Sequence, residues 1–194
     1  MKSMQRVALA LIALVISAAV PADSRPVAFD VQHSKMTVHV YKQGVFSFFA
    51  DNHEVNAPLL SGSYDSEAKT IELTVDATKM RVLDPKMTAQ KRDSVQANMV
   101  GPQVLDVAAH PTISFHSTAI DDADPNRWTV TGTLALRGQT HPIVVHVLKT
   151  DATHFSGSAT VRQTAFGITP IKIAGGVVSV KDDVNVEFDI ALTP

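Results

Sequence analysis

The chain has 194 residues, 45% of them hydrophobic, and a formal net charge of −2. It contains no cysteine, which excludes disulfide bonds, thiol nucleophiles and thiolate metal sites. Because it also has no run of basic residues, it lacks the electrostatic pattern of proteins that bind nucleic acid or anionic membranes.

The N-terminus has the layout of a secretory signal peptide. A short basic head with Lys2 and Arg6 precedes an uncharged, mostly apolar run over residues 7–20, and small residues follow up to Ala22. The run is shorter than the roughly 20 apolar residues that span a bilayer. We therefore expect cleavage after Ala22, with Ala19 as the alternative, and export to a bacterial periplasm. An uncleaved membrane anchor is the less favoured alternative.

The rest of the chain is predicted to form one domain. Residues 1–22 are assigned to the signal peptide and residues 23–194 to the domain, which is long enough to bury a substantial core. Removal of the signal takes away Lys2 and Arg6, so the net charge falls from −2 to about −4. No linker or internal repeat divides the domain.

Apolar and polar residues alternate with a period of two through most of the domain, which predicts strands with one apolar face. The alternating segments are 36–40, 71–75, 113–115, 128–130, 134–136, 143–147 and 184–190. Turn-forming clusters such as 121–126 and 181–183 separate them. Short spacing between the turns favours antiparallel neighbours, so we predict an all-β fold of eight or nine strands, a barrel or a sandwich.

One segment departs from this period. Between Pro85 and Val100 the alternation stops, and Met87, Val95 and Met99 recur at multiples of four residues. Gly101 and Pro102 then follow, as is typical of a helix end. The sequence therefore predicts one inserted helix over 85–100, with a mostly polar surface that favours a lid or a flank.

The chain carries no recognisable catalytic motif, and we predict that it is not an enzyme. It has no nucleophile elbow, P-loop, dinucleotide fingerprint or His-Glu-x-x-His motif. Of its eight histidines, no two have the local spacing of a metal chelate. His53, in the polar stretch 51–54, is either a hydrogen-bonded loop residue or a metal ligand with Asp51 as a neighbour. No metal or cofactor is assigned.

Two further segments have both a structural and a functional interpretation. The aromatic strand 45–50, with Phe46, Phe48 and Phe49, is either core on both faces or lines an internal cavity. The stretch 166–170 combines an aromatic residue, a glycine and a proline, and it predicts a deliberate break in the strands rather than a catalytic loop.

Taken together, these segments resemble the YceI-like family of bacterial periplasmic lipid-binding proteins over nearly the whole mature chain. The resemblance is carried by residues 30–34, 44–49, 61–65, 92–99, 110–117, 132–142, 166–168 and 188–190. It implies an extended antiparallel barrel like that of lipocalins, with a polyisoprenoid or similar amphiphile in an elongated tunnel. The chain departs from the family where Gln90 to Asp93 replace a histidine-leucine pair, and where Asp51 replaces a second histidine.

We therefore expect a periplasmic carrier that binds an amphiphilic lipid, of polyisoprenoid or fatty-acyl type, with a homodimer as one possible assembly. The alternative is a periplasmic metal-binding or stress-response module that uses the His53 loop. The candidate ligand-binding residues are the apolar positions Met36, Val38, Val40, Phe46, Phe48, Ile113, Phe115, Leu134, Leu136, Val145 and Phe188. A filled, ligand-free interior would remove the carrier hypothesis.

Overall fold

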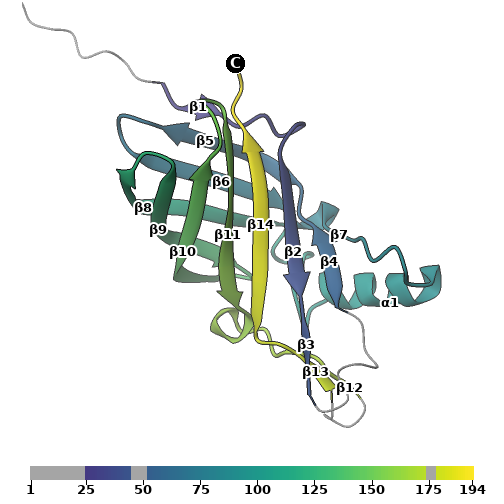
Figure 1. Ribbon diagram of the computed structural model, residues 1–194. Coiled ribbons are helices and arrows are strands. Elements are labelled where there is room, and N and C mark those ends of the chain that lie inside the picture. Colours follow the sequence, from purple (N-terminus) through teal and green to yellow (C-terminus); the bar gives the residue numbers. More distant parts are fainter. Residues whose placement is uncertain (1–24, 45–51, 174–177) are drawn as a thin grey trace, which may run out of the picture.

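The computed structural model describes residues 25–44, 52–173 and 178–194, which form an elongated β-structure with one α-helix at its side (Figure 1). The strands are β1 (Val27–Ala28), β2 (Lys35–Val40), β3 (Lys42–Gln43), β4 (His53–Asn56), β5 (Leu59–Asp65), β6 (Thr70–Asp76), β7 (Arg81–Val82), β8 (Thr112–Asp124), β9 (Arg127–Leu136), β10 (Gln139–Lys149), β11 (His154–Arg162), β12 (Lys172–Ile173), β13 (Val178–Val180) and β14 (Asp183–Ala191). The helices are α1 (Ala89–Val100) and the 3₁₀ turns η2 (Ala77–Lys79) and η3 (Gln163–Phe166). Over the described residues, no helix has both the length and the apolar character needed to cross a membrane.

The main sheet closes on itself. Its strands follow the order β1-β5-β6-β8-β9-β10-β11-β14-β2-β4-β7, and each neighbouring pair is antiparallel. β1 and β2 follow one another along a single chain segment, as do β4 and β5, and β6 and β7. The strands at the two ends of the order, β1 and β7, therefore belong to segments whose other strand already lies within the sheet. The result is an up-and-down barrel with eight strand positions. This confirms the predicted all-β antiparallel barrel.

Two neighbouring strands bend at the same level of the barrel. Pro58, which has no N–H to donate to a ladder, separates β4 from β5, and η2 separates β6 from β7. The Asp76 N–H donates to the Pro58 carbonyl (3.1 Å), and the Ala57 N–H donates to the Met36 carbonyl (2.9 Å). Hydrogen bonds therefore continue through the bend, and the wall stays intact.

At the upper end of the barrel in Figure 1, the chain around Phe29 connects two strands. The Phe29 N–H donates to Gly62 (2.9 Å) and the Asp30 N–H donates to Ala191 (2.8 Å), so this segment connects β5 to β14. At the lower end, β12, β13 and β3 form a separate small sheet in that order. It is tied to the barrel by the Lys181 N–H, which donates to the Tyr41 carbonyl (2.7 Å).

Helix α1 begins at Ala89 and not at Pro85, so the predicted range of 85–100 was too long at its start. The Met87 N–H donates to Asp84 in a turn (3.0 Å), and the Thr88 hydroxyl oxygen then caps the helix. The predicted end is confirmed, because Gly101 follows Val100 as the C-cap. The helix has no buried residue, as expected for a flanking element.

One side chain of α1 completes the barrel wall. The Gln96 Oε1 accepts a hydrogen bond from the Val82 N–H (2.9 Å), and its Nε2 donates to the Met80 carbonyl (2.9 Å). β7 pairs with β4 on one side only. Gln96 therefore satisfies backbone groups at the edge of this wall strand that no neighbouring strand reaches.

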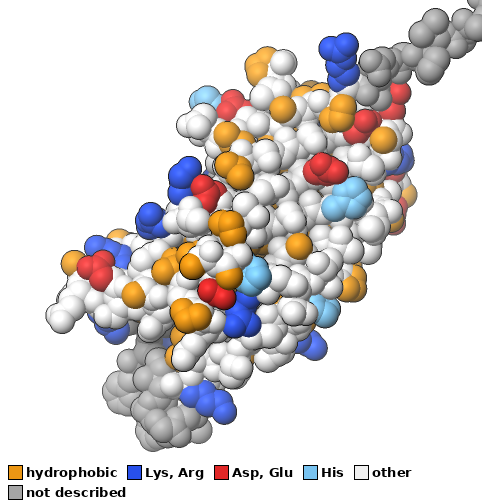
Figure 2. All heavy atoms as spheres, turned by 180° about the vertical axis from the view of Figure 1, so that it is seen from behind, with side chains coloured by type: hydrophobic (Ala, Val, Ile, Leu, Met, Phe, Trp, Pro, Cys, Tyr) orange, Lys and Arg blue, Asp and Glu red, His pale blue; other side chains and the backbone are white. Residues whose placement is uncertain are grey.

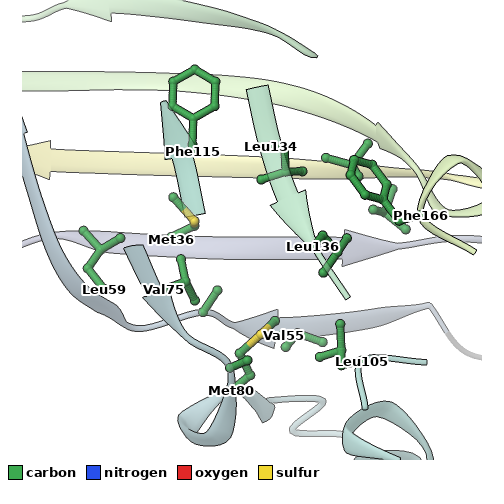
Figure 3. Packing of buried hydrophobic residues seen from close by; sticks show 14 of the residues in the cluster. Met36, Val55, Leu59, Val75, Met80, Leu105, Phe115, Leu134, Leu136 and Phe166 are labelled. Atoms are coloured by element: carbon green, nitrogen blue, oxygen red, sulfur yellow. The ribbon is translucent and has the colours of Figure 1, made fainter. Parts of the chain in front are cut away.

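The core lies inside the barrel, as the period of two predicts. In β9, Trp128, Val130, Leu134 and Leu136 are buried and alternate with more exposed residues. Figure 3 shows Phe115 and Leu134 of the barrel strands among the buried side chains, with Leu105 from the segment after α1. The inner faces of the strands and this segment form one continuous hydrophobic cluster.

The stretch 166–170 has the structural role predicted for it. Phe166 is only 1% exposed, and Gly167 takes a left-handed conformation (φ 68°) that glycine adopts without strain. The Arg137 guanidinium donates to the carbonyls of Gly167 (2.7 Å) and Pro102 (2.8 Å). This break in the strands thus anchors η3 beside the segment that follows α1.

Candidate functional site: an apolar cavity inside the barrel

The barrel encloses a cavity of about 240 Å³. Of the 34 lining residues in the described part of the chain, only Ser114 and Gln163 are not hydrophobic. The interior of the barrel is therefore hollow and apolar.

The cavity brings together nine of the eleven predicted binding residues. They are Met36, Val38, Val40, Ile113, Phe115, Leu134, Leu136, Val145 and Phe188. The other two, Phe46 and Phe48, lie outside the described residues, as does the rest of the aromatic strand predicted over 45–50. Whether the nine touch a ligand stays a prediction.

Sequence reasoning missed an aromatic cluster at the upper end of the cavity. The ring of Trp128 lies 5.6 Å from that of Tyr64 and 5.2 Å from that of Phe155, measured between centroids. The pKa of the Tyr64 phenol is raised, mainly because the side chain is partly buried. The phenol is therefore neutral at physiological pH. The signal for Trp128 was present, because it alternates with Val130, but nothing in the sequence showed which strand ends meet.

The lower part of the cavity is lined in part by the segment around the end of α1. Met99, Val104 and Leu105 line it, and Leu105 is buried. The Leu105 N–H donates to the Met99 carbonyl (3.1 Å), which folds this segment back on the helix end. The four-residue spacing of Val95 and Met99 was the available signal, since both pack against the core.

Three glycines leave space on the wall for aromatic rings. A Cβ placed on Gly62 would overlap the ring of Phe29 and no other group within 3 Å. One on Gly132 would overlap the ring of Phe115 and the His116 carbonyl, and one on Gly157 would overlap the His146 carbonyl and the ring of Phe188. Rings that lie against glycine occupy the wall instead of the middle of the barrel, and this helps to keep the interior open.

His53, the first residue of β4, is hydrogen-bonded to the carboxylate of Asp84. Its Nδ1 lies 2.6 Å from Asp84 Oδ2, and the other oxygen of Asp84 accepts the Glu54 N–H at 2.8 Å. Over the described residues there is no group of three or more His, Cys, Asp or Glu that could hold a metal. Asp51, the suggested second ligand, lies outside these residues, so the metal hypothesis stays a prediction.

Within this geometry, the chain is an antiparallel β-barrel with a hollow, apolar interior. It belongs to the YceI-like domain family, whose family model matches residues 21–192. The resemblance found in the sequence is thereby confirmed. No curated protein matches the chain.

Solved structures of low sequence identity share the fold. BcnA of Burkholderia cenocepacia is 20% identical, with a TM-score of 0.60 over 85% of this chain and 99% of that one. A polyisoprenoid binding domain from Saccharophagus degradans, implicated in plant cell wall breakdown, is 14% identical, with a TM-score of 0.58 over 85% and 96%. The YCEI protein of Campylobacter jejuni is 13% identical, with a TM-score of 0.50 over 98% and 99%.

Proposed function

We propose that the protein binds the tail of an amphiphilic lipid, of polyisoprenoid or fatty-acyl type, inside the barrel and carries it without chemical change. The observation that supports this most directly is the hollow interior, where only two of the described lining side chains are not hydrophobic. Tyr64 is the one titratable residue in the described lining. The proposal assigns no group there to acid, base or nucleophilic chemistry.

The hydrophobic effect is large enough to hold such a tail. Each methylene taken out of water contributes about 0.8 kcal/mol, so roughly 15 buried carbons contribute about 12 kcal/mol before any losses. Association and ordering cost at least about 4 kcal/mol. The remaining 8 kcal/mol or so corresponds to a dissociation constant near micromolar. Such a cavity needs no charged group to bind a tail, and it discriminates weakly between isoprenoid and acyl chains.

The solved relative from Saccharophagus degradans is named as a polyisoprenoid binding domain, which favours an isoprenoid among the possible tails. The signal-like N-terminus favours action in a periplasm, with residues 23–194 as the mature carrier domain. The native mass of the purified protein distinguishes a monomer from a homodimer.

The proposal is tested by purifying the protein from the periplasm and examining it by native mass spectrometry. We expect an added mass that disappears after solvent extraction and reappears in the extract as a hydrophobic lipid. The emptied protein is then titrated with geranylgeraniol and hexadecanol while the emission of Trp128 is followed, since it is the only tryptophan and lines the cavity. Absence of any retained lipid, together with absence of binding in the titrations, would refute the carrier function.

A further inference from the structure

Three aromatic rings meet across the interior of the barrel at its upper end. Tyr64 belongs to β5, Trp128 to β9 and Phe155 to β11. In the sheet, β6 and β8 separate β5 from β9, and β10 separates β9 from β11. The centroids of the rings nevertheless lie only 5.6 Å (Tyr64 to Trp128), 5.2 Å (Trp128 to Phe155) and 6.1 Å (Tyr64 to Phe155) apart. The rings therefore come from well-separated parts of the wall and contact one another in the middle.

These contacts leave no passage for a hydrocarbon chain between the rings. Carbon atoms in contact are about 3.5–4 Å apart, so a chain that ran between two rings would hold their centres at least about 7 Å apart. All three separations are shorter. Tyr64, Trp128 and Phe155 also line the cavity. They thus form an aromatic plug at its upper end.

The solvent side of the aromatic plug is covered. Trp128 and Phe155 are only 7% and 8% exposed. Lys149, which lies further toward the upper end of β10, has its Nζ 6.0 Å from the centre of the Trp128 ring, and its backbone N–H donates to the Asn126 carbonyl (2.8 Å). On the face shown in Figure 2, the surface over the upper part of the barrel is continuous. A tail that lies in the cavity therefore ends at the aromatic plug.

The length of the cavity follows from the strands that line it. On β9 the lining runs from Trp128 to Leu136, and along β14 it runs from Val184 to Leu192, just after the strand. Each stretch advances by eight residues, which cover about 20 Å of the barrel axis at about 3.3 Å per residue and a tilt of about 40°. An extended chain advances about 3.5 Å for every three bonds, so about 16 bonds span this length. Since the cavity holds only about 240 Å³, it is narrow and favours a tail in single file.

Given the proposed function, we propose that Tyr64, Trp128 and Phe155 set the longest tail that the protein accepts, at about 16 carbons along the chain. A hexadecyl chain has this length, as does an isoprenoid of about four units. The extra carbons of a longer polyisoprenoid would stay in water, where they add nothing to the affinity. The apolar wall discriminates weakly between kinds of tail, so the aromatic plug provides the specificity, by length.

The test measures which tail lengths the protein takes from a membrane. The emptied protein is incubated with phosphatidylcholine vesicles that contain equal amounts of the even-numbered saturated alcohols from dodecanol to tetracosanol. It is then separated from the vesicles, and the retained alcohols are extracted and quantified by mass spectrometry. A methylene is out of water both in the bilayer and in the cavity, so retention should vary little up to about 16 carbons. Retention should then fall about fourfold for each further methylene, because about 0.8 kcal/mol is lost for each one left in water.

Variants of the aromatic plug should move this limit. Trp128→Ala and Phe155→Ala each remove a ring that occupies about 5 Å, so the limit should rise by about four carbons. The matched control Phe115→Ala removes the same ring from the side wall, where Phe115 lies against Gly132, and should leave the limit unchanged. Tyr64→Phe keeps all three rings of the plug and should also leave the limit unchanged.

The outcomes distinguish this inference from the function on which it rests. Undiminished retention up to tetracosanol, a limit that does not rise in the plug variants, or an equal rise in Phe115→Ala would overturn the role of the plug alone. If the wild type retains no alcohol, the carrier function fails and the length limit fails with it. Thermal unfolding verifies that each variant is folded, and Phe155→Leu, for which a smaller rise is expected, takes the place of an alanine variant that is not.

Discussion

The ring of Phe29 lies directly against Gly62, across the pairing of the N-terminal segment with β5. The Phe29 N–H donates to the Gly62 carbonyl at 2.9 Å, so backbone and ring hold the same place on the wall. No side chain larger than hydrogen fits beneath the ring. The same contact therefore closes the upper end of the barrel and sets how far the Phe29 ring extends into the cavity.

The substitution Gly62→Ala should therefore force the Phe29 ring away from the wall. We expect a loss of roughly 1–3 kcal/mol in the free energy of unfolding, as is typical of overpacking, and weaker binding of long tails. Urea unfolding measures the first effect and ligand titration the second. Because the overlap is with the ring alone, Gly62→Ala/Phe29→Leu should recover much of the loss. An unchanged stability in the single variant would contradict the close contact.

The interior should be fillable without disturbing the wall. Ala159 lines the cavity from β11, and its neighbour Ser158 is exposed. We expect Ala159→Phe to weaken binding of hexadecanol and geranylgeraniol at least about tenfold, because the new ring takes the place of several methylenes worth about 0.8 kcal/mol each. Ser158→Phe is the matched control and should bind like the wild type. Equal affinities in the two variants would exclude the cavity as the binding site.

The hydrogen bonds of Gln96 should be important for stability. Gln96→Ala leaves the Val82 N–H and the Met80 carbonyl without their partners, and we expect a loss of about 1–3 kcal/mol in the free energy of unfolding. The control Gln90→Ala changes the same residue type at an exposed position of α1 and should cost little. Denaturant unfolding of both variants measures the difference, and similar values would argue against a role for Gln96 in the wall.

Stability should depend on acid through Asp151. The hydrogen bond from the Thr153 backbone N–H, followed by the side-chain hydrogen bond with His154, lowers the pKa of its carboxyl from 3.8 to about 2. Since the folded-state pKa lies below the unfolded one, the contribution is complete above about pH 4 and is lost as the pH falls through about 2. The difference in unfolding stability between wild type and Asp151→Asn should therefore be flat near neutral pH and shrink between pH 4 and pH 2. A difference that grows with acidification would have the wrong sign.

The part of the structure that the sequence predicts is the part that depends on local periodicity. Val38 and Leu134 were assigned to the interior because they alternate with polar neighbours, and both line the cavity. The helix start was misplaced because the loss of period two at Pro85 also fits the turn that Asp84 and Met87 form before Thr88 caps the helix.

Features that depend on long-range strand pairing could not be predicted from the sequence. Trp128 and Phe155 meet only because β9 and β11 are both registered against β10. The glycines beneath the rings give no periodic signal, since glycine at position 62 or 132 is equally consistent with a turn or a bulge.

The closed wall also bears on how the protein behaves while its cavity is empty. An open sheet offers unpaired N–H and C=O groups along its edge, and a second chain can add a strand there and start an aggregate. Around this barrel, the edges of β1 and β7 that face away from their partner strands are bonded to the β14 end and to Gln96. In the described chain, the remaining edges belong to β12 and β3, each two residues long. A molecule with an empty cavity thus offers, in its described part, little edge at which a second chain could add a strand.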